Sequence, residues 1–422
     1  MKFIHKYSWV SLMVCWLIWI LNAYDREIIL RLGPTISETF DLSPEAWGGI
    51  ASVVMLALAV MAIPGSAMSD KYGGGWKRAR FQVPLVIGYT ALSFLSGFKF
   101  ISHNIVAFVA LRVGVNLGAG WGEPVGVSNT AEWWPKERRG FAASFANMGG
   151  PAGAVLATLA VSAVSTLPDE QFLAWGWRIP FIASIALVGI GLLIRLKVTE
   201  SPLFLALEDK AEEKRLPILE VLTKYPKSVI SGTLVGMSSY TVQGLMTVWA
   251  ISYVVDSVGL DRTSVLNIKA IGATLTIVGI YFAARFSDRL GRRPVMMVGI
   301  LAGAVLALPI MFMLQLGQLW LFAIGLFVAN GLIQAFIFGP FGAFTAELFP
   351  TRMRYTGASL VYQLSSTIGA GFTPMIVAGL VVLGGGSLWI AGTVWAAAFL
   401  VAALAMRTVK EGKDADLTAA EM

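Results

Sequence analysis

Twelve apolar runs of 20 to 30 residues, separated by polar segments, constrain this chain more than any other feature. About 20 predominantly apolar residues are enough for an α-helix to cross the hydrocarbon core of a bilayer. Inside lipid only helices and closed barrels satisfy the backbone, and these runs lack the period-two alternation of barrel strands. We therefore predict an all-α membrane protein with twelve transmembrane helices. The predicted spans are residues 8–31, 45–69, 81–100, 104–133, 140–165, 173–197, 228–255, 265–287, 294–316, 318–346, 355–383 and 386–406.

The composition supports the same class. Hydrophobic residues make up 56% of the chain and charged residues only 14%, whereas soluble domains carry roughly 25% charged residues. The net charge of +7 could suggest nucleic acid as a partner, but the charges stand in short clusters between the apolar runs. That placement is typical of membrane topology, so we expect the lipid bilayer and no nucleic acid as a partner.

The positions of the basic residues indicate how the chain is oriented in the membrane. Lysine and arginine gather near both termini and in the segments 71–80, 136–139, 289–293 and 352–354. The segments that fall on the opposite side are mainly acidic, at 38–45, 169–170 and 256–261. Because cytoplasmic loops carry the excess of basic residues, we expect both termini in the cytoplasm. We expect a multi-pass protein of the cell membrane, in a bacterium the inner membrane.

Two motifs recur in the two halves of the chain. Glu347 follows Glu132 by 215 residues, and in both copies a proline stands three residues later and an arginine seven later. Asp288 follows Asp70 by 218 residues, each within a polar loop that ends in glycine. Such a repeat predicts two pseudo-symmetric six-helix bundles with a substrate site between them. We place the bundles at 1–198 and 228–422, with a polar, helical cytoplasmic linker at 199–227.

These motifs resemble the major facilitator superfamily. The loop from Ser287 to Pro294 is similar to the signature between helices 8 and 9 of that family, and Asp70 to Gly73 is similar to its partner between helices 2 and 3. Further segments resemble the metabolite:proton symporter, sugar-porter and anion:cation symporter branches, namely Tyr24–Arg26, Trp177–Phe181, Glu200–Pro202 and Ala346–Thr351. The resemblance implies the major facilitator fold and transport by alternating access.

Charged residues at the cytoplasmic helix ends predict a gate. Carboxylates and guanidiniums at a dry interface can hold two helices together, and removing one partner of a buried pair costs about 3–5 kcal/mol. The alternative is that the basic loops only orient the protein in the membrane. The predicted gate residues are Asp70, Glu132, Arg139, Asp288, Arg292, Glu347 and Arg354.

Ionisable residues within the first span are candidates for transport chemistry, because a charge inside the bilayer is costly. Asn22 and Arg26 share a face with Trp19, and Asp25 is adjacent to Arg26. The planar fork of an arginine suits a carboxylate ligand, and a buried carboxyl can carry a coupling proton. We predict that Asn22 and Arg26 bind substrate and that Asp25 carries a proton. The alternative is an Asp–Arg pair that caps the outer helix end.

The fourth span carries Arg112, Asn116 and Glu123 on one face. Arg112 and Glu123 are about 16 Å apart along a helix, too far to pair, so each needs a partner elsewhere or a water-filled cavity. We predict Glu123 as a second proton site, the alternative being a structural carboxyl. Arg112 either binds substrate or holds helices together.

The second half offers neutral polar side chains rather than a central charge. Amides and phenols suit the hydroxyl and carbonyl groups of a substrate. The alternative is hydrogen bonding between helices, which stabilises by about 0.6 kcal/mol on average. The predicted substrate-binding residues here are Tyr240, Gln243, Asn330, Gln334, Tyr362 and Gln363.

These observations predict a proton-coupled symporter of a small organic anion, such as a carboxylate or a sugar acid. We expect substrate and protons as its small partners, no cofactor or metal, and a monomer. The alternatives are a proton-coupled exporter of drugs or other hydrophobic compounds and a transporter-like ligand sensor. No phosphate-binding loop or catalytic triad spacing stands out, so we expect no enzyme.

Overall fold

The computed structural model describes residues 2–72, 87–101, 103–185, 217–350 and 353–412. Within these ranges seven helices are long and apolar enough to cross a membrane, and two shorter apolar helices accompany them. The chain divides into two compact units. The first unit comprises Met1–Trp133 and Gly149–Pro217, and the second comprises Trp134–Met148 and Ile218–Met422.

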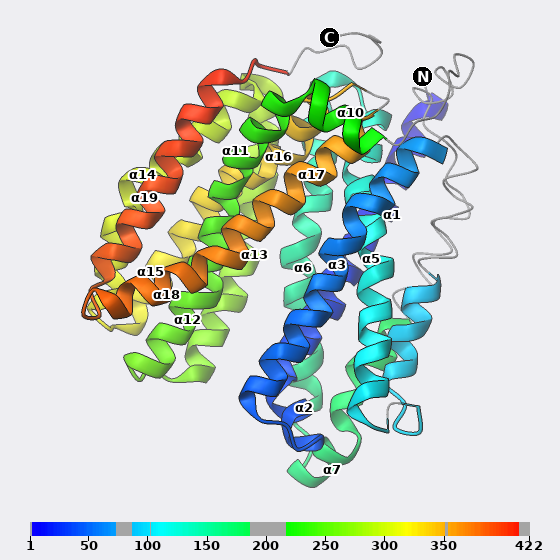
Figure 1. Cartoon of the computed structure of the whole chain (residues 1–422), viewed down its shortest axis with the longest axis vertical. Coiled ribbons are helices and arrows are strands. Elements are labelled where there is room, and N and C mark those ends of the chain that lie inside the picture. The colour runs from blue at the N-terminus through cyan, green and yellow to red at the C-terminus, as the bar shows by residue number, and fades with distance from the viewer. Residues whose placement is uncertain (1, 73–86, 102, 186–216, 351–352, 413–422) are drawn as a thin grey trace. The chain divides into compact units, whose positions relative to one another are not determined.

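The first unit is built on the packing of three long helices. Its elements are α1 (Lys2–Arg31), α2 (Gly33–Thr39), α3 (Pro44–Tyr72), the helix Ile87–Ser96, α5 (Ile105–Trp133), the later part of α6 (Arg139–Val164) and α7 (Asp169–Ala174). Helix α5 packs along both α1 and α3 (Figure 1). Helix α6 approaches α1 closely because it carries glycines: a Cβ added at Gly153 would lie 2.7 Å from the amide nitrogen of Tyr24.

Aromatic side chains form a buried core in the first unit. Phe108 and Phe181 contact Trp177 edge-on at centroid distances of about 6 Å, and Phe40 joins them. Tyr24 reaches the same cluster and donates a hydrogen bond from its hydroxyl to the carbonyl of Pro180. These rings fix the first spans around the segment that bears Arg178 and Phe181.

The second unit is described over nearly all its length. Its elements are α10 (Pro217–Lys224), α11 (Pro226–Gly244), α12 (Ala250–Ser252), α13 (Arg262–Leu290), α14 (Arg292–Gln315), α15 (Leu319–Phe327), α16 (Ala335–Glu347), α17 (Arg354–Ser366), α18 (Thr373–Leu383) and α19 (Leu388–Thr408). Helix α19 packs along α14 and against α11, which also contacts α17, while α13 packs along α16. Figure 1 shows α14 and α19 side by side.

Two local signals set the limits of α13. Asp261 accepts a hydrogen bond from the backbone N–H of Ser264 at 2.7 Å and so caps the first turn. At the other end Gly291 has a φ of 106°, a conformation that favours glycine. This turn leads directly into α14 and leaves Asp288 and Arg292 on either side of it.

Four wide helical turns interrupt the spans of the second unit. They occupy Leu245–Trp249, Tyr253–Ser257, Val328–Gln334 and Thr367–Phe372, where the hydrogen bonds follow the π-helical pattern. Such turns are rare and occur often at functional sites. They fall in the three predicted spans that carry the neutral polar candidates.

The predicted spans agree with the helices of the structure to within a few residues where both can be compared, except that α1 begins six residues before the predicted span 8–31. Spans 104–133, 265–287 and 318–346, for example, correspond to Ile105–Trp133, Arg262–Leu290 and Leu319–Glu347. The short helices α2 and α7 were not predicted. The expected linker is described only from residue 217 onward, so the division at 198 and 227 stays a prediction. The structure assigns Trp134–Met148, expected in the first bundle, to the second unit.

Candidate functional site

An ion pair between Asp25 and Arg112 lies inside the first unit. Nη1 of Arg112 is 3.0 Å from Oδ2 of Asp25, and the residues are 0% and 8% exposed, respectively. Asp25 lies six residues before the end of α1, and Arg112 lies seven residues after the start of α5. At 1.5 Å per residue each is about 10 Å inside its helix. The partner of Asp25 is therefore a buried arginine on another span, and the pair does not cap a helix end.

Neighbouring side chains hold both members of this pair. Ser93 donates its hydroxyl to Oδ1 of Asp25, and the hydroxyl of Ser184 lies 3.4 Å from that of Ser93. The guanidinium carbon of Arg112 lies 5.0 Å from the ring centroid of Phe181, a distance at which a cation is attracted to the aromatic face. The aromatic core thus orients the arginine, and the serine orients the carboxylate.

Some polar atoms in and next to this ion pair have no hydrogen-bond partner within the described residues. Nε and Nη2 of Arg112 have no hydrogen-bond partner within the described residues, and neither amide atom of Asn22 has one. Asn22 is 5% exposed and lies three residues before Asp25 on α1. Buried polar groups in native proteins are generally hydrogen-bonded, so unpaired ones call for an explanation. Donors of this kind suit an anionic ligand, because a guanidinium can bind a carboxylate through two parallel hydrogen bonds.

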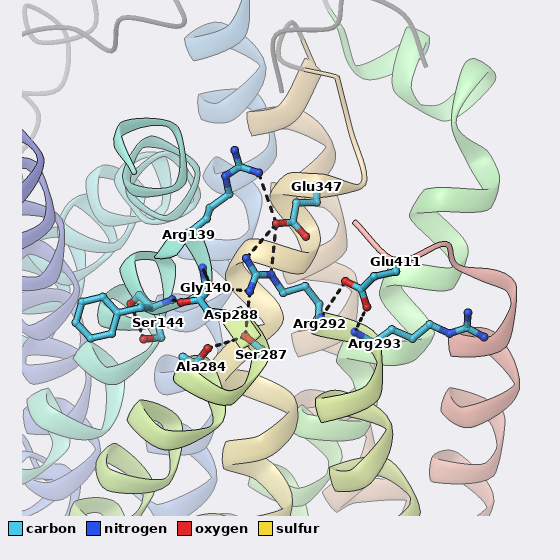
Figure 2. A network of polar contacts seen from close by, with 11 residues as sticks. Arg139, Gly140, Ser144, Ala284, Ser287, Asp288, Arg292, Arg293, Glu347 and Glu411 are labelled. Atoms are coloured by element: carbon cyan, nitrogen blue, oxygen red, sulfur yellow. Dashed lines mark hydrogen bonds and ion pairs between the residues drawn. The ribbon is translucent and has the colours of Figure 1, made fainter. Parts of the chain in front are cut away.

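A second ionic cluster lies in the second unit (Figure 2). Asp288, near the end of α13, accepts hydrogen bonds from the backbone N–H groups of Gly140 and Phe141 at 2.8 and 2.9 Å. Both amides belong to the first turn of α6, where a negative charge is favoured by the helix dipole. Nη1 of Arg292 also donates to Oδ1 of Asp288, at 2.6 Å.

Glu347 connects this cluster to two arginines. Its Oε1 atom lies 3.3 Å from Nη2 of Arg292 and 3.7 Å from Nη1 of Arg139. The three side chains are 1 to 7% exposed. Burial opposes the charge of each group, so these contacts must offset a desolvation cost. Arg354, also predicted here, is fully buried and donates from Nε to the carbonyl of Ala346.

The tail after α19 supplies a carboxylate that was not predicted. Both oxygens of Glu411 accept backbone hydrogen bonds, from Arg292 and Arg293, at 2.9 Å. These are the first amides of α14, so Glu411 caps that helix (Figure 2). The next residue, Gly412, passes so close to Glu347 that an added Cβ would lie 2.8 Å from its Cβ.

A neutral polar group lies deeper in the second unit. The hydroxyl of Tyr362 donates to Oδ1 of Asn147 at 3.1 Å, and Nδ2 of Asn147 donates to the carbonyl of Phe338 at 2.6 Å. The ring of Phe338 packs edge-on against Tyr240 and Tyr362. Two predicted substrate residues, Tyr240 and Tyr362, therefore contact the same phenylalanine.

The remaining neutral candidates are spread along the widened turns. Asn330 and Gln334 are buried within Val328–Gln334, and Oδ1 of Asn330 has no hydrogen-bond partner in the described chain. Gln363 is half-buried, and Gln243 is exposed just before the turn Leu245–Trp249. Arg26 is half-buried on α1. The substrate roles of these five residues stay predictions, as do those of the other four predicted substrate-binding residues.

Three predicted charged residues cannot be placed in either cluster. Asp70 lies on α3, and Glu123 and Glu132 lie on α5, but their side chains fall outside the described part of the structure. Among the described residues, no three histidine, cysteine or acidic side chains gather as metal ligands would.

The family follows from the sequence as a whole. A profile described as Major Facilitator Superfamily matches residues 15–374 and 229–421. The chain belongs to the major facilitator superfamily. It is thus a multi-pass membrane transporter, which is not an enzyme, with a small-molecule substrate.

Relatives agree with this assignment. The inner membrane metabolite transport protein YhjE of Escherichia coli (strain K12) is 32% identical over 350 residues, which cover 78% of each chain. The shikimate transporter of the same organism is 32% identical over 316 residues, covering 74% of this chain and 72% of that protein. These are transporters, as this major facilitator protein is.

Solved structures share the fold. The proton:xylose symporter XylE bound to 6-bromo-6-deoxy-D-glucose aligns with a TM-score of 0.75 at 17% identity, covering 97% of this chain and 98% of the other. The outward conformation of the transporter FucP aligns with a TM-score of 0.65 at 16% identity, covering 94% and 98%. The predicted twelve-helix major facilitator fold is thereby confirmed.

Three polar side chains of this major facilitator protein escaped the sequence reasoning. Ser93 and Asn147 each lie within a predicted span, and a polar residue inside a span is a signal that could have been used. Glu411 lies in a polar tail, where a carboxylate is common and indicates no particular contact. Only the packing brings it to the start of α14.

Proposed function

We propose that this transporter is a proton-coupled symporter of a small organic anion, with Asp25 and Arg112 as its coupling pair. The observation that carries the proposal is the buried ion pair whose arginine has two donor nitrogens without a hydrogen-bond partner among the described residues. A pair of this kind can be opened by protonating its carboxylate. It then offers a desolvated guanidinium to an anion.

Proton binding to Asp25 and anion binding to Arg112 are coupled because each changes the affinity for the other. With Asp25 ionised, its charge neutralises Arg112 and competes with any anion for it. With Asp25 protonated, Arg112 is free to bind the anion, so proton binding and anion binding favour each other by the same factor. An empty carrier would then return with the internal ion pair formed, and a loaded one would carry proton and anion together. This mechanism replaces Arg26 with Arg112 as the principal anion ligand.

The substrate class rests on charge and on the polar groups around it. Asn22, three residues before Asp25, has no partner for either amide atom within the described part of the chain and would suit a hydroxyl or carbonyl of the anion. One relative is named as a transporter of shikimate, which is a hydroxylated carboxylate. We therefore favour a carboxylate or sugar acid over a cationic drug, which a buried arginine would repel.

The second cluster fits the predicted cytoplasmic gate. Arg139, Asp288, Arg292 and Glu347 tie the starts of α6 and α14 to the ends of α13 and α16. We propose that this cluster stabilises one conformation of the transport cycle and opens in the other. Glu411, in the tail after α19, caps α14 beside this cluster, so a cytoplasmic C-terminus would make this a cytoplasmic gate, in a bacterium at the inner membrane.

Uptake into proteoliposomes tests the proposal. The substrate panel comprises mono- and dicarboxylates, sugar acids and cationic drugs, each offered with and without an inward proton gradient. We expect a carboxylate to accumulate only with the gradient. In Asp25→Asn we expect that accumulation to be lost while exchange of internal for external substrate continues.

The matched control is Glu27→Gln. Glu27 lies two residues from Asp25 on the same helix and pairs with Arg31 at 3.3 Å. The substitution therefore removes one negative charge from α1 without changing the partner of Arg112. Unchanged accumulation in Asp25→Asn would refute the role of Asp25. Proton-driven export of a cation, with carboxylates inactive, would favour the exporter, and binding without accumulation would favour a sensor.

A further inference from the structure

A groove on the outer surface of the second unit has two arginines at one end and an apolar floor. It lies between α14 and α19, which pack side by side, and measures about 340 Å³. Its lining consists of Arg293, Pro294, Met297, Leu301, Ala403 and Arg407. Arg293, Met297 and Leu301 follow one another at four-residue intervals, so α14 presents a single face to it.

The two arginines are 114 residues apart in sequence and meet at the same end of the two helices. Nη2 of Arg293 donates to the backbone carbonyl of Arg407 at 3.3 Å. Within the part of the chain that the structure describes, neither guanidinium is paired with a carboxylate. The carboxylate closest in sequence to Arg407, that of Glu411, is held by the backbone amides of Arg292 and Arg293. Among the described residues, two positive charges are therefore available to an external anion.

The floor of the groove belongs to the surface that faces lipid. Both helices are long and apolar enough to cross the membrane. Leu301 is 50% exposed, and its outward-facing neighbours Val298 and Leu404 are 58% and 62% exposed. Apolar side chains exposed on a membrane-spanning helix are contacted by acyl chains. A ligand here thus meets guanidiniums at one end and hydrocarbon along the rest.

We propose that this groove binds one anionic phospholipid, with its phosphate on Arg293 and Arg407 and an acyl chain along Met297 and Leu301. Basic pockets between membrane helices near the cytoplasmic surface are suited to such headgroups. A soluble phosphate would use the arginines but not the floor. A zwitterionic lipid would use the floor but gain less from two unneutralised charges. This site is independent of the transported substrate.

Native mass spectrometry of the purified full chain tests the proposal. The probes are phosphatidylglycerol, cardiolipin and phosphatidylcholine with the same acyl chains, added at equal concentrations. We expect the anionic lipids to be retained in preference. In the double variant Arg293→Gln/Arg407→Gln the preference should fall about thirtyfold, since each basic residue near the surface strengthens binding about fivefold.

The matched control is Arg285→Gln. Arg285 is an exposed arginine on α13 of the same unit and lies outside the groove, so its replacement should leave the preference unchanged. Excess inorganic phosphate should not displace the lipid. The proposal is overturned if the double variant binds anionic lipid like the wild type, if Arg285→Gln loses as much, or if phosphate displaces the lipid. It is also overturned if the double variant alters only the fraction of dimer, because the groove would then be covered by a second copy.

Discussion

In the first unit one buried carboxylate, Asp25, faces one buried guanidinium, Arg112, with a single serine at its side. In the second unit Asp288 and Glu347 share Arg292, and two backbone amides and Arg139 add further contacts. Removing one partner leaves a single buried charge in the first case and a reduced network in the second. An ion pair with few contacts can therefore be switched by one proton, whereas a network with many contacts holds helix ends together.

The largest effect is expected from Arg112→Gln. We expect carboxylate uptake to fall to background and the free energy of unfolding to drop by about 3–5 kcal/mol, because Asp25 is left buried without its cation. Thermal unfolding in detergent and proteoliposome uptake measure the two effects. In Asp25→Asn/Arg112→Gln most of the lost stability should return. A double variant as unstable as the single one would mean that the two residues are not energetically coupled.

Glu347→Gln tests the second ionic cluster. We expect a loss of stability toward the lower end of about 3–5 kcal/mol, because Arg292 keeps Asp288 as a partner. Substrate binding should survive, whereas the balance of conformations should shift toward the open gate. Labelling of a cysteine introduced at Ser144, in the cysteine-free background Cys15→Ser, reports the opening as a faster reaction. Unchanged labelling would show that the cluster does not control access.

Ser93→Ala tests how the hydrogen bond from Ser93 supports the ion pair of Asp25 and Arg112. The hydroxyl of Ser93 donates to the carboxylate of Asp25, and a hydrogen bond to a charged group contributes about 1.5–3 kcal/mol. We expect uptake to weaken severalfold but to remain driven by the proton gradient, since Arg112 still holds Asp25. Ser96→Ala is the control, because Ser96 bonds to the backbone carbonyl of Ser93. Complete loss of coupling in Ser93→Ala would place Ser93 on the proton path itself.

The smallest effect should come from a carboxylate outside both clusters. Hydrogen bonds from Ser264 hold the pKa of the Asp261 carboxyl below its usual range. A carboxyl whose pKa is lowered on folding adds stability above its unfolded pKa of about 3.9, and that stability is lost as the pH falls through the folded value. The difference in melting temperature between wild type and Asp261→Ala should therefore shrink between pH 6 and pH 3. A constant difference would mean that the cap acts without its charge.

The helices were the part best predicted from the sequence. A run such as 104–133 is apolar because it meets lipid or other helices along its whole length, and Ile105–Trp133 follows from it directly. Helices α2 and α7 were missed because seven and six residues are too few to show a period. The widened turns were missed because a π-helical turn needs no particular residue.

The candidate site was predicted residue by residue but not as an arrangement. Asp25 and Arg112 were each selected because charge inside a span is costly, yet their pairing joins residues 87 apart. The repeat indicated Asp288 and Glu347 as members of two separate motifs, and the packing shows that Arg292 connects them. The contacts of Asn147 and Glu411 depend on which helices meet, which spacing along one helix does not contain.

The most direct test of the coupling pair is the proton uptake that accompanies anion binding. Purified transporter in weakly buffered solution receives the carboxylate identified by the uptake panel, and the pH change is recorded. Linkage predicts about one proton taken up per anion bound by the wild type when Asp25 starts ionised, and none by Asp25→Asn. Glu27→Gln should behave like the wild type. Equal proton uptake by wild type and Asp25→Asn would show that Asp25 does not carry the coupling proton.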